Sequence, residues 1–263
     1  MKLQIVPASR GVQWAKLGMR TFLKQPLALV GLFFMFMAMI SLLSMVPLLG
    51  NVGALILIPG ATLGFMAAAK EAQGGNFPMP VILVTAFREG PDKRRAMLVL
   101  GVLYMLGFLL VLGISALADG GKFARLYLVG GSMSVELMEA ADFELALLLS
   151  MVLYLPLSLM FWHAPALVHW HGVSPAKSVF FSLVACKRNF SAFTVFGLVW
   201  LGVFMAVGVA VAFVSLAMGN PDMVAVLMFP AAMLIAAMFF TSLFFSYRDC
   251  FDDTMDDTAG ETP

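Results

Sequence analysis

The longest uncharged segment of the chain runs from Gln25 to Ala69 and contains no Lys, Arg, Asp, Glu or His over 45 residues. An α-helix rises about 1.5 Å per residue and the hydrocarbon core of a bilayer is about 30 Å thick, so this segment is long enough to cross a membrane twice. We expect a turn between the two crossings at Gly50-Asn51-Val52-Gly53. The segment therefore predicts an integral membrane protein.

The composition agrees with several membrane-spanning helices. Charged residues make up 12% of the chain, about half of the share that is usual in soluble proteins. Continuous apolar runs exclude a β-barrel, whose strands give segments of about ten residues with alternating polarity. A net charge of +1 gives no support to nucleic-acid binding, so we expect no nucleic-acid partner. Two cysteines, Cys186 and Cys250, are too few for a disulfide framework.

Six apolar segments are bounded by charged or turn residues and have the length of a membrane span. They are Pro26–Leu48, Val52–Ala69, Ala96–Ala118, Leu145–Trp162, Phe190–Met218 and Met223–Tyr247. The fold class that follows is all-α, a polytopic membrane protein with six transmembrane helices. We expect a single transmembrane domain over residues 1–248 and a disordered acidic tail over 249–263, which carries six acidic residues and no Lys or Arg.

The distribution of basic residues predicts the orientation of the spans. With six spans, both termini and the loops 70–95 and 163–189 lie on one side. Fourteen of the sixteen Lys and Arg residues lie on that side, and only Lys122 and Arg125 lie on the other. Because cytoplasmic loops carry the excess of Lys and Arg, we expect both termini in the cytoplasm and the chain in a bacterial inner membrane.

Two basic segments that precede pairs of spans have the pattern of amphipathic helices in the cytoplasmic interface. In residues 11–24 the basic side chains recur every four residues and fall in an arc of about 80°. In residues 174–188, Ser174 suits an N-cap and Pro175 the first helical position. We expect five basic residues of these segments to contact the membrane interface: Lys16, Arg20, Lys24, Lys177 and Arg188.

The same two segments share the pattern Gly-Val-x-x-Ala-Lys, at residues 11–16 and 172–177. Each pattern opens a basic helix that precedes a pair of spans. This similarity suggests an internal duplication, with halves at 10–118 and 145–248. The segment 80–95 is a third, less regular candidate for an interfacial element.

Several short motifs resemble a known family. Arg10-Gly11-Val12-x-Trp14, Phe22-x-x-x-Pro26 and Val46-Pro47-Leu48-Leu49-Gly50 are similar to a beta-proteobacterial six-helix inner-membrane family of unknown function. Ala164-Pro165-Ala166-Leu167-Val168, Gly172-x-x-x-Ala176-x-Ser178 and Arg188-Asn189 resemble, more distantly, the membrane domains fused to glycerophosphodiester phosphodiesterases. The resemblance implies a six-helix bundle with cytoplasmic amphipathic elements. It implies no catalysis, because the activity of those fusions belongs to a separate soluble barrel.

The histidines His163, His169 and His171 are the candidate metal ligands. On a helix, His169 and His171 point about 200° apart and cannot share a metal ion. A loop after Pro165 could bring the histidines together for metal or proton handling. We favour the alternative, an aromatic and histidine belt at the membrane interface, and therefore expect no metal and no other cofactor.

Two further patterns predict helix packing. Gly60-x-x-x-Gly64 lets another backbone approach closely, and we expect its partner within this chain. Met35 and Met39 share one face of the first span, while Met37 points away. Two thioethers on one face indicate packing rather than a Cu(I) site.

The sequence contains no nucleophile elbow, zinc-protease pattern or phosphate-binding loop, and none of the six segments contains a charged residue. We therefore expect a non-enzymatic inner-membrane protein that acts as a lipid-contacting or partner-binding accessory subunit. The alternative is a small transporter or flippase-like protein for an apolar or amphiphilic solute, and a membrane enzyme that uses the histidine segment comes third. The expected partners are membrane lipids and, for an accessory subunit, another membrane protein. The oligomeric state does not follow from the sequence.

Overall fold

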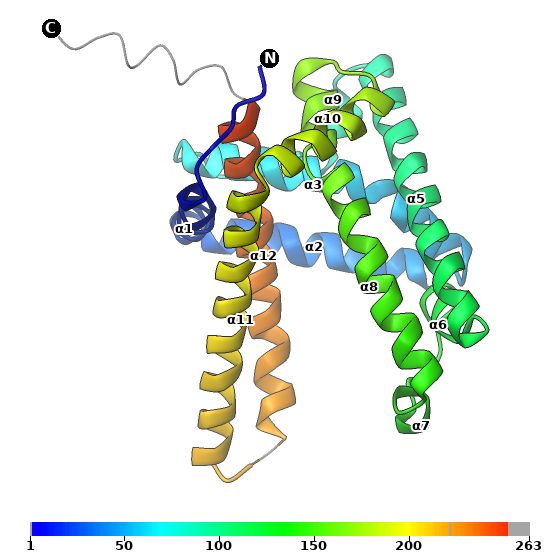
Figure 1. The fold of residues 1–263 in the computed structure, drawn as a ribbon. Coiled ribbons are helices and arrows are strands. Elements are labelled where there is room, and N and C mark those ends of the chain that lie inside the picture. The colour runs from blue at the N-terminus through cyan, green and yellow to red at the C-terminus, as the bar shows by residue number, and fades with distance from the viewer. Residues whose placement is uncertain (1, 221, 252–263) are drawn as a thin grey trace, which may run out of the picture. The chain divides into compact units, whose positions relative to one another are not determined.

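The computed structural model describes residues 2–220 and 222–251, and these residues form helices and connecting turns without a β-strand (Figure 1). Within them, six stretches are long and apolar enough to cross a membrane. These are α2 (Pro26–Ser44), α3 (Leu49–Gln73), α5 (Pro91–Asp119), α8 (Ala141–Phe161) continued by α9 (Ala164–His171), α11 (Phe190–Ala217) and α12 (Met223–Phe251). The predicted all-α class with six membrane spans is confirmed.

The shorter helices lie before and between the spans. They are α1 (Ser9–Lys24), the 3₁₀ turn η1 (Pro80–Val84), α4 (Thr85–Arg88), α6 (Lys122–Val129), α7 (Val135–Met138) and α10 (Pro175–Arg188). The amphipathic segments predicted at 11–24 and 174–188 are both helical. The irregular segment 80–95 contains η1, α4 and the start of α5.

The turn between the first two spans lies earlier in the chain than predicted. α2 ends at Ser44 and α3 begins at Leu49, so Gly50-Asn51-Val52-Gly53 belongs to α3. The reversal is made by residues 45–48, of which Leu48 has a left-handed φ of 62°. The Asn51 side chain stabilises this tight turn, because it accepts a hydrogen bond from Ser44 Oγ at 2.7 Å and donates one to the Leu128 carbonyl at 2.9 Å.

The described chain packs as two compact units. Unit 1 is formed by the described residues of Met1–Phe34, Gly64–Leu83 and Ala185–Pro263, and unit 2 by Met35–Leu63 and Val84–Val184. The units interleave along the sequence and so differ from the halves 10–118 and 145–248 that the repeated pattern suggested. The internal duplication itself stays a prediction.

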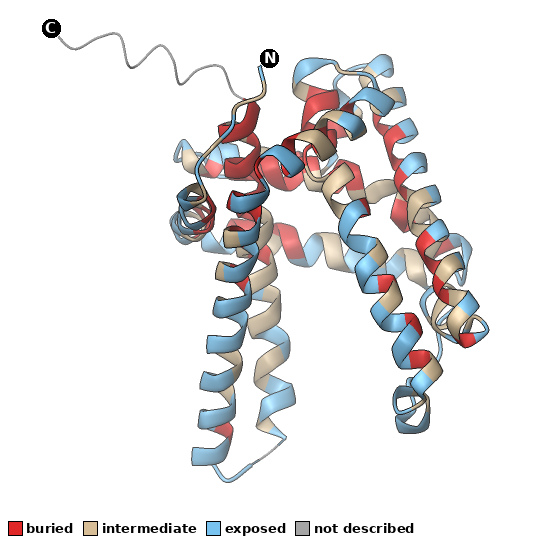
Figure 2. Ribbon diagram, in the orientation of Figure 1, coloured by how far each residue is buried: buried red, intermediate tan, exposed pale blue. Residues whose placement is uncertain are grey.

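Unit 1 is built around the close approach of α1 to α11 and α12. Glycines permit this approach: a Cβ at Gly11 would collide with the Ala192 carbonyl oxygen, and one at Gly18 with Ser242. Trp14 is fully buried among these helices, with its ring 5.2 Å from that of Phe193. Figure 2 shows that burial is concentrated where α1 meets α11 and α12 and fades along both long helices.

Unit 2 is built around α5, which packs against α8, α6 and α9. A Cβ at Gly107 would lie 2.5 Å from Leu157 Cδ1, and one at Gly101 would collide with the Ile56 carbonyl oxygen. α8 and the α3 backbone therefore pack directly on α5. The sequence could identify these small residues but not the helices that approach them.

The predicted packing of Gly60-x-x-x-Gly64 within the chain is confirmed, although its partner is not a second span. A Cβ at Gly60 would lie 2.6 Å from the Phe87 ring, within unit 2. A Cβ at Gly64 would lie 2.8 Å from Leu83 Cα, within unit 1. The irregular segment that contains η1 and α4 therefore packs closely against α3 at both glycines.

The predicted start of the acidic tail at Asp249 is wrong. α12 continues to Phe251, and Asp249, Cys250 and Phe251 are all buried. An acidic residue in this position is stable only because it is paired, as described below. Residues 252–263, the rest of the predicted tail, lie outside the described residues.

Candidate functional site

α1 has a basic face and a buried face. Its buried residues are Gly11, Trp14, Ala15, Gly18, Thr21 and Phe22. Lys16, Arg20 and Lys24 are all exposed, as the four-residue spacing predicts. Lys24 Nζ donates a hydrogen bond to the Gln73 carbonyl at 3.0 Å, which ties the end of α1 to the end of α3 within unit 1. The packing of the buried face of α1 therefore fixes its orientation and leaves the three basic side chains exposed.

Lys177 and Arg188, the other two predicted interface residues, lie on α10 and are also exposed. Pro175 is the first residue of this helix and Arg188 the last, which agrees with the predicted bounds. Contact of all five basic residues with the membrane interface stays a prediction.

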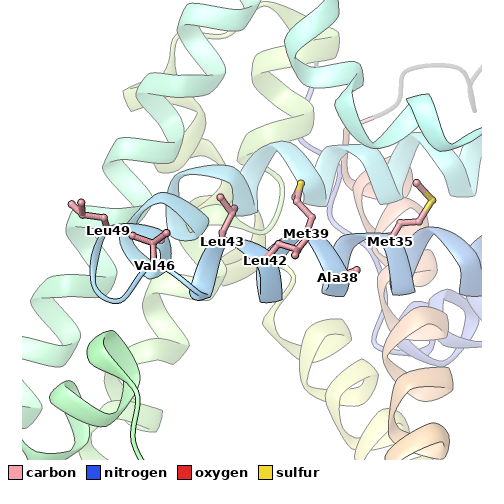
Figure 3. A pocket seen from close by; sticks show the side chains of 8 residues that line it. Met35, Ala38, Met39, Leu42, Leu43, Val46 and Leu49 are labelled. Carbon is pink, nitrogen blue, oxygen red and sulfur yellow. The ribbon is translucent and has the colours of Figure 1, made fainter.

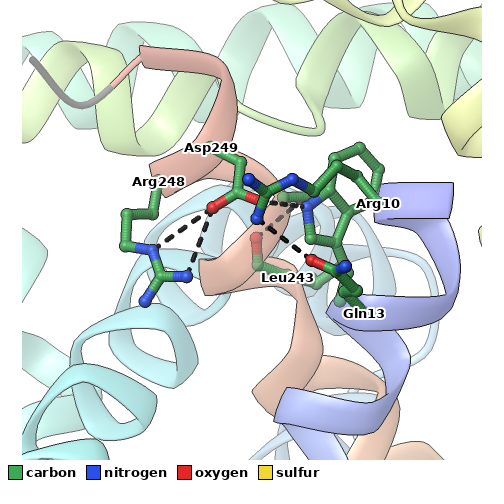
Figure 4. Close-up of polar contacts among 7 residues, drawn as sticks. Arg10, Gln13, Leu243, Arg248 and Asp249 are labelled. Atoms are coloured by element: carbon green, nitrogen blue, oxygen red, sulfur yellow. Dashed lines mark hydrogen bonds and ion pairs between the residues drawn. The ribbon is translucent and has the colours of Figure 1, made fainter. Parts of the chain in front are cut away.

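A buried carboxylate joins the start of α1 to the end of α12 (Figure 4). Trp14 Nε1 donates a hydrogen bond to Asp249 Oδ2 at 2.9 Å, and Arg10 Nη1 lies 3.5 Å from the same oxygen. Arg248 donates from Nε and Nη2 to Asp249 Oδ1 at 3.3 and 3.2 Å. The Asp249 side chain is only 4% exposed. Its burial is tolerated because both oxygens are paired.

A second buried polar residue, Asn189, holds the N-terminal segment in unit 1. Its Oδ1 accepts from the Val6 amide at 2.8 Å, and its Nδ2 donates to the carbonyls of Gln4 and Ala185 at 3.0 and 3.1 Å. The Gln4 amide also donates to the Cys250 carbonyl at 3.0 Å. Residues 4–6 are thus bound between the start of α11 and the end of α12.

The motifs that resemble the inner-membrane families contain several of these polar residues. Arg10 and Trp14 come from the opening motif, and Asn189 follows Arg188 in the last one. In the structure Arg10 and Trp14 contact Asp249, while Asn189 lies beside Cys250. The motifs therefore mark the buried polar contacts of unit 1. No signal in the sequence pointed to Asp249 itself.

The histidine segment forms helix α9, so the predicted alternative of a loop after Pro165 is wrong. The side chains of His163 and His169 are buried, whereas His171 is exposed. His169 Nε2 lies 3.2 Å from Glu89 Oε1. Within residues 2–220 and 222–251, no group of three or more His, Cys, Asp or Glu side chains is arranged to hold a metal ion.

Glu89 connects this segment to the start of α5. Lys93 Nζ donates to Glu89 Oε2 at 2.8 Å. The hydrogen bond from Lys93 lowers the pKa of Glu89 below its ordinary value, partial burial opposes this change, and the nearby His169 lowers the pKa further. The three side chains form a structural link between α9 and α5 that the sequence did not reveal.

An apolar groove of about 670 Å³ runs along α2 to the first turn of α3 in unit 2 (Figure 3). It is lined by Met35, Ala38, Met39, Leu42, Leu43, Val46, Leu49 and Gly50. Met35 and Met39 share this face, as predicted, and Met37 does not line it. Since all the lining residues are apolar, the groove has the character of a lipid-facing or helix-packing surface.

The loop between the third and fourth spans contains α6 and α7, which the span pattern did not predict. The Asp119 carboxylate accepts hydrogen bonds from the amides of Gly121 and Phe123 at 2.8 and 2.6 Å and so organises the first turn of α6. At the other end of α6, the Leu128 carbonyl accepts from the Leu48 amide and from Asn51 Nδ2, both at 2.9 Å. α6 is therefore held at both ends.

A protein of Burkholderia thailandensis described as the probable inner membrane protein BTH_II0599 is 39% identical over 254 residues, which are 95% of this chain and 94% of the other. No family model and no solved structure matches the chain. The predicted similarity to a beta-proteobacterial inner-membrane protein is supported over nearly the whole length. The more distant similarity to the membrane domains of glycerophosphodiester phosphodiesterases gains no support from these comparisons.

Proposed function

Because the chain belongs to the family of the Burkholderia thailandensis probable inner membrane protein, we propose that it is a non-enzymatic accessory protein of the inner membrane that contacts anionic lipid headgroups through α1. The predicted orientation, with both termini in the cytoplasm, is part of this proposal. It places the basic face of α1 at the cytoplasmic leaflet.

The observation that carries the proposal is the fixed position of the basic face. Trp14 and Phe22 bury one side of α1 against unit 1, so Lys16, Arg20 and Lys24 stay outward. The described residues of unit 1 contain nine Lys and Arg but only three acidic residues, one of which is the paired Asp249. Each basic residue near an anionic surface contributes about 1 kcal/mol, and salt weakens this attraction.

The roles of the buried polar groups support a non-enzymatic function. Asn189 and Asp249 are occupied by contacts that hold helices and the N-terminal segment together. Ser182 Oγ accepts from the His163 amide at 2.9 Å and donates to the Leu159 carbonyl at 2.8 Å, which joins α10 to the junction of α8 and α9. These polar groups hold elements of the fold together, as expected for a protein that contacts lipids or a partner and does not catalyse a reaction.

The test compares lipid selectivity in reconstituted vesicles. Spin-labelled phosphatidylglycerol should associate with the wild-type protein more strongly than spin-labelled phosphatidylcholine. The triple variant Lys16→Gln, Arg20→Gln, Lys24→Gln should lose at least about half of this preference, because about 1 kcal/mol per charge is removed. The control Glu136→Gln, Glu139→Gln, two exposed charges at the predicted outer end, should not lose it. An unchanged preference in the triple variant would refute the proposed function.

The orientation has its own test. Cysteines replace Ser9 and Ser134 one at a time, in a background where the buried Cys186 and Cys250 are changed to Ala. A membrane-impermeant thiol reagent applied to intact cells, with the outer membrane permeabilised, should label position 134 and not position 9. Labelling of position 9 would place the basic face of α1 on the wrong side for this function.

The transporter or flippase-like alternative is favoured by one observation, the pair of apolar cavities in unit 2 that is described below. It predicts that the reconstituted protein moves labelled phospholipid between leaflets faster than protein-free vesicles do. Absence of this movement, together with selective binding at α1, would favour the accessory function.

A further inference from the structure

Two neighbouring apolar cavities lie between α5, α6, α7 and α8 in unit 2. The first has a volume of about 170 Å³ and is lined by Phe108, Tyr127, Met151 and Tyr154. The second has a volume of about 200 Å³ and is lined by Met133, Met138, Phe143 and Glu144. Phe123 and Leu147 line both cavities, so the two cavities adjoin each other along α6 and α8, and together they are called the path.

Aromatic side chains in contact with one another line the first cavity of this path. The ring of Phe108 lies 4.9 Å from that of Tyr127 and 5.9 Å from that of Tyr154, centroid to centroid. The Asp119 carboxylate holds the first turn of α6 and thereby the Phe123 backbone. Because α6 is bound at both ends, the wall that α6 contributes to the path is in place without an occupant.

The surface that the path offers is apolar. The hydroxyls of Tyr104 and Tyr154 hydrogen-bond to each other at 3.1 Å, so Tyr154 presents its ring. Ser150 lines the first cavity, but its hydroxyl oxygen is buried and has no hydrogen-bond partner among the described residues. Apolar cavities of about 150 Å³ hold hydrocarbon groups rather than water. An alkyl chain therefore suits the path better than a polar solute.

The length of the path matches one leaflet of a bilayer. Along α8 it extends from Glu144 to Tyr154, ten residues and about 15 Å at 1.5 Å per residue. The hydrocarbon core is about 30 Å thick, so each leaflet supplies about 15 Å. One acyl chain from the leaflet at the α6–α7 end would fill this length.

Charges of both signs lie at the α6–α7 end of the path. Lys122 Nζ lies 2.5 Å from Asp142 Oδ2, and both side chains are about half exposed. Arg125 and Glu144 are exposed nearby on the same two helices, α6 and α8. A phosphate beside Lys122 and an ammonium beside Glu144 would both be complemented. This mixture fits a zwitterionic headgroup, in contrast to the basic face of α1.

We propose that the two cavities bind one acyl chain of a phosphatidylethanolamine-type phospholipid, with its headgroup at Lys122, Asp142 and Glu144. The site is separate from α1 and does not rest on the function proposed above. It adds a zwitterionic-lipid site in unit 2 to the basic contact of unit 1.

The test uses the full-length protein reconstituted with phosphatidylethanolamine that carries a photoreactive group on its acyl chain. Cross-linked peptides should come mainly from residues 108–112, 123–127 and 147–154. Leu147→Trp should lower this labelling about five-fold or more, because the indole would occupy the space where the two cavities adjoin. A five-fold change corresponds to about 1 kcal/mol. Leu148→Trp, the same change at the next residue, which lines neither cavity, should leave labelling within about two-fold.

Further arms separate folding from binding. Leu147→Ala should retain the labelling, which covers the case in which Leu147→Trp fails to fold. The triple variant of α1 should also retain it, so that failure of one site can be told from failure of the other. Labelling spread evenly over all spans, or equal in the Leu147→Trp and Leu148→Trp proteins, would overturn the proposal.

The headgroup assignment is tested with the same photoreactive chain on phosphatidylglycerol and as a free fatty acid. Phosphatidylethanolamine should label the site at least about two-fold more strongly than either. The double variant Lys122→Gln, Asp142→Asn should remove this preference and keep the pattern of labelled peptides. Equal labelling by all three probes would overturn the assigned headgroup.

Discussion

Units 1 and 2 each bury a carboxylate and use it differently. In unit 1, Asp249 accepts from the Trp14 side chain, 235 positions away in the sequence, and pairs with Arg10. In unit 2, Asp119 accepts from the backbone amides of Gly121 and Phe123, a few positions further along. A carboxylate with distant partners holds a tertiary arrangement, whereas one with adjacent backbone partners organises a local turn. Removal of Asp249 should therefore destabilise the packing of unit 1, whereas removal of Asp119 should loosen only the turn at the start of α6.

The units also differ in charge. The described part of unit 1 contains nine basic and three acidic residues, whereas unit 2 contains seven of each. An excess of one sign favours an anionic surface, and a balanced mixture favours zwitterionic or paired groups. The proposed lipid contacts follow this difference, with anionic headgroups at α1 and a zwitterionic headgroup at α6 and α8.

The largest expected effect belongs to Asp249→Ala in unit 1. Removal of the carboxylate leaves Trp14 Nε1 buried without its acceptor and removes the ion pair with Arg10, so the free energy of unfolding should fall by about 3 kcal/mol. Asp249→Asn keeps an acceptor and should cost less. Thermal unfolding in detergent, followed by tryptophan fluorescence, measures the change. The control is Asp222→Ala, because Asp222 is exposed in the same unit. If Asp249→Ala and Asp222→Ala lowered the free energy of unfolding by the same small amount, the Asp249 contacts would add no stability.

The next effect tests whether both units are equally close-packed. Gly11→Ala in unit 1 and Gly101→Ala in unit 2 place a methyl group against a backbone carbonyl, which should cost about 1–3 kcal/mol each. Gly197→Ala and Gly113→Ala meet open space and should be neutral or stabilising by up to about 1 kcal/mol. The same unfolding measurement applies. If Gly101→Ala behaved like its control, the α3–α5 contact of unit 2 would be looser than the α1–α11 contact of unit 1.

A smaller and local effect is expected for Asp119→Ala. Loss of its two hydrogen bonds to backbone amides should cost about 1 kcal/mol and loosen the start of α6. Hydrogen exchange measured by mass spectrometry should increase in residues 122–129 and stay unchanged in unit 1. Glu136→Ala, at the exposed start of α7, serves as the control. A fall in the unfolding midpoint as large as that of Asp249→Ala would contradict the local role.

The smallest effect concerns Glu89 and depends on pH. The hydrogen bond from Lys93 lowers the pKa of Glu89 in the folded protein. Its contribution is therefore present above the unfolded pKa of about 4.3 and is lost as the pH falls through the lower, folded value. Since Glu89 is about half exposed, this contribution should be only a few tenths of a kcal/mol.

The measurement compares unfolding midpoints of the wild-type protein and Glu89→Gln between about pH 3 and pH 7. The difference should be present at neutral pH and shrink at the acidic end. Glu136→Gln, which lies on another exposed turn of unit 2, should give no comparable difference. A difference between wild type and Glu89→Gln that grew on acidification would have the wrong sign.

Much of the fold could be predicted because its signals are local. Pro26, Phe190 and Met223 were predicted as the first residues of spans and are the first residues of α2, α11 and α12. The outward direction of Lys16, Arg20 and Lys24 followed from their four-residue spacing. Helical periodicity and apolar length depend only on neighbouring residues, so no contact had to be known.

The errors share one cause. Asp249 was assigned to a disordered tail because acidic residues in a run are usually solvated, and only the distant Trp14 and Arg10 make its burial favourable. His169 carried no sign of its partner Glu89. The turn was placed at Gly50–Gly53 because glycine favours turns, whereas α3 begins at Leu49, and the reversal at 45–48 is held by hydrogen bonds of Asn51 with Ser44 and with the distant Leu128.

The sequence by itself determined that this is an all-α membrane protein with six spans and basic amphipathic helices, because a bilayer selects for length and apolar composition, which are properties of short segments. Only the tertiary structure decided which polar groups are buried, which glycines admit another backbone, and where α6 leaves apolar space beside α5 and α8. Those outcomes depend on pairs of residues that are far apart in the chain, and a single sequence does not specify which distant groups will meet.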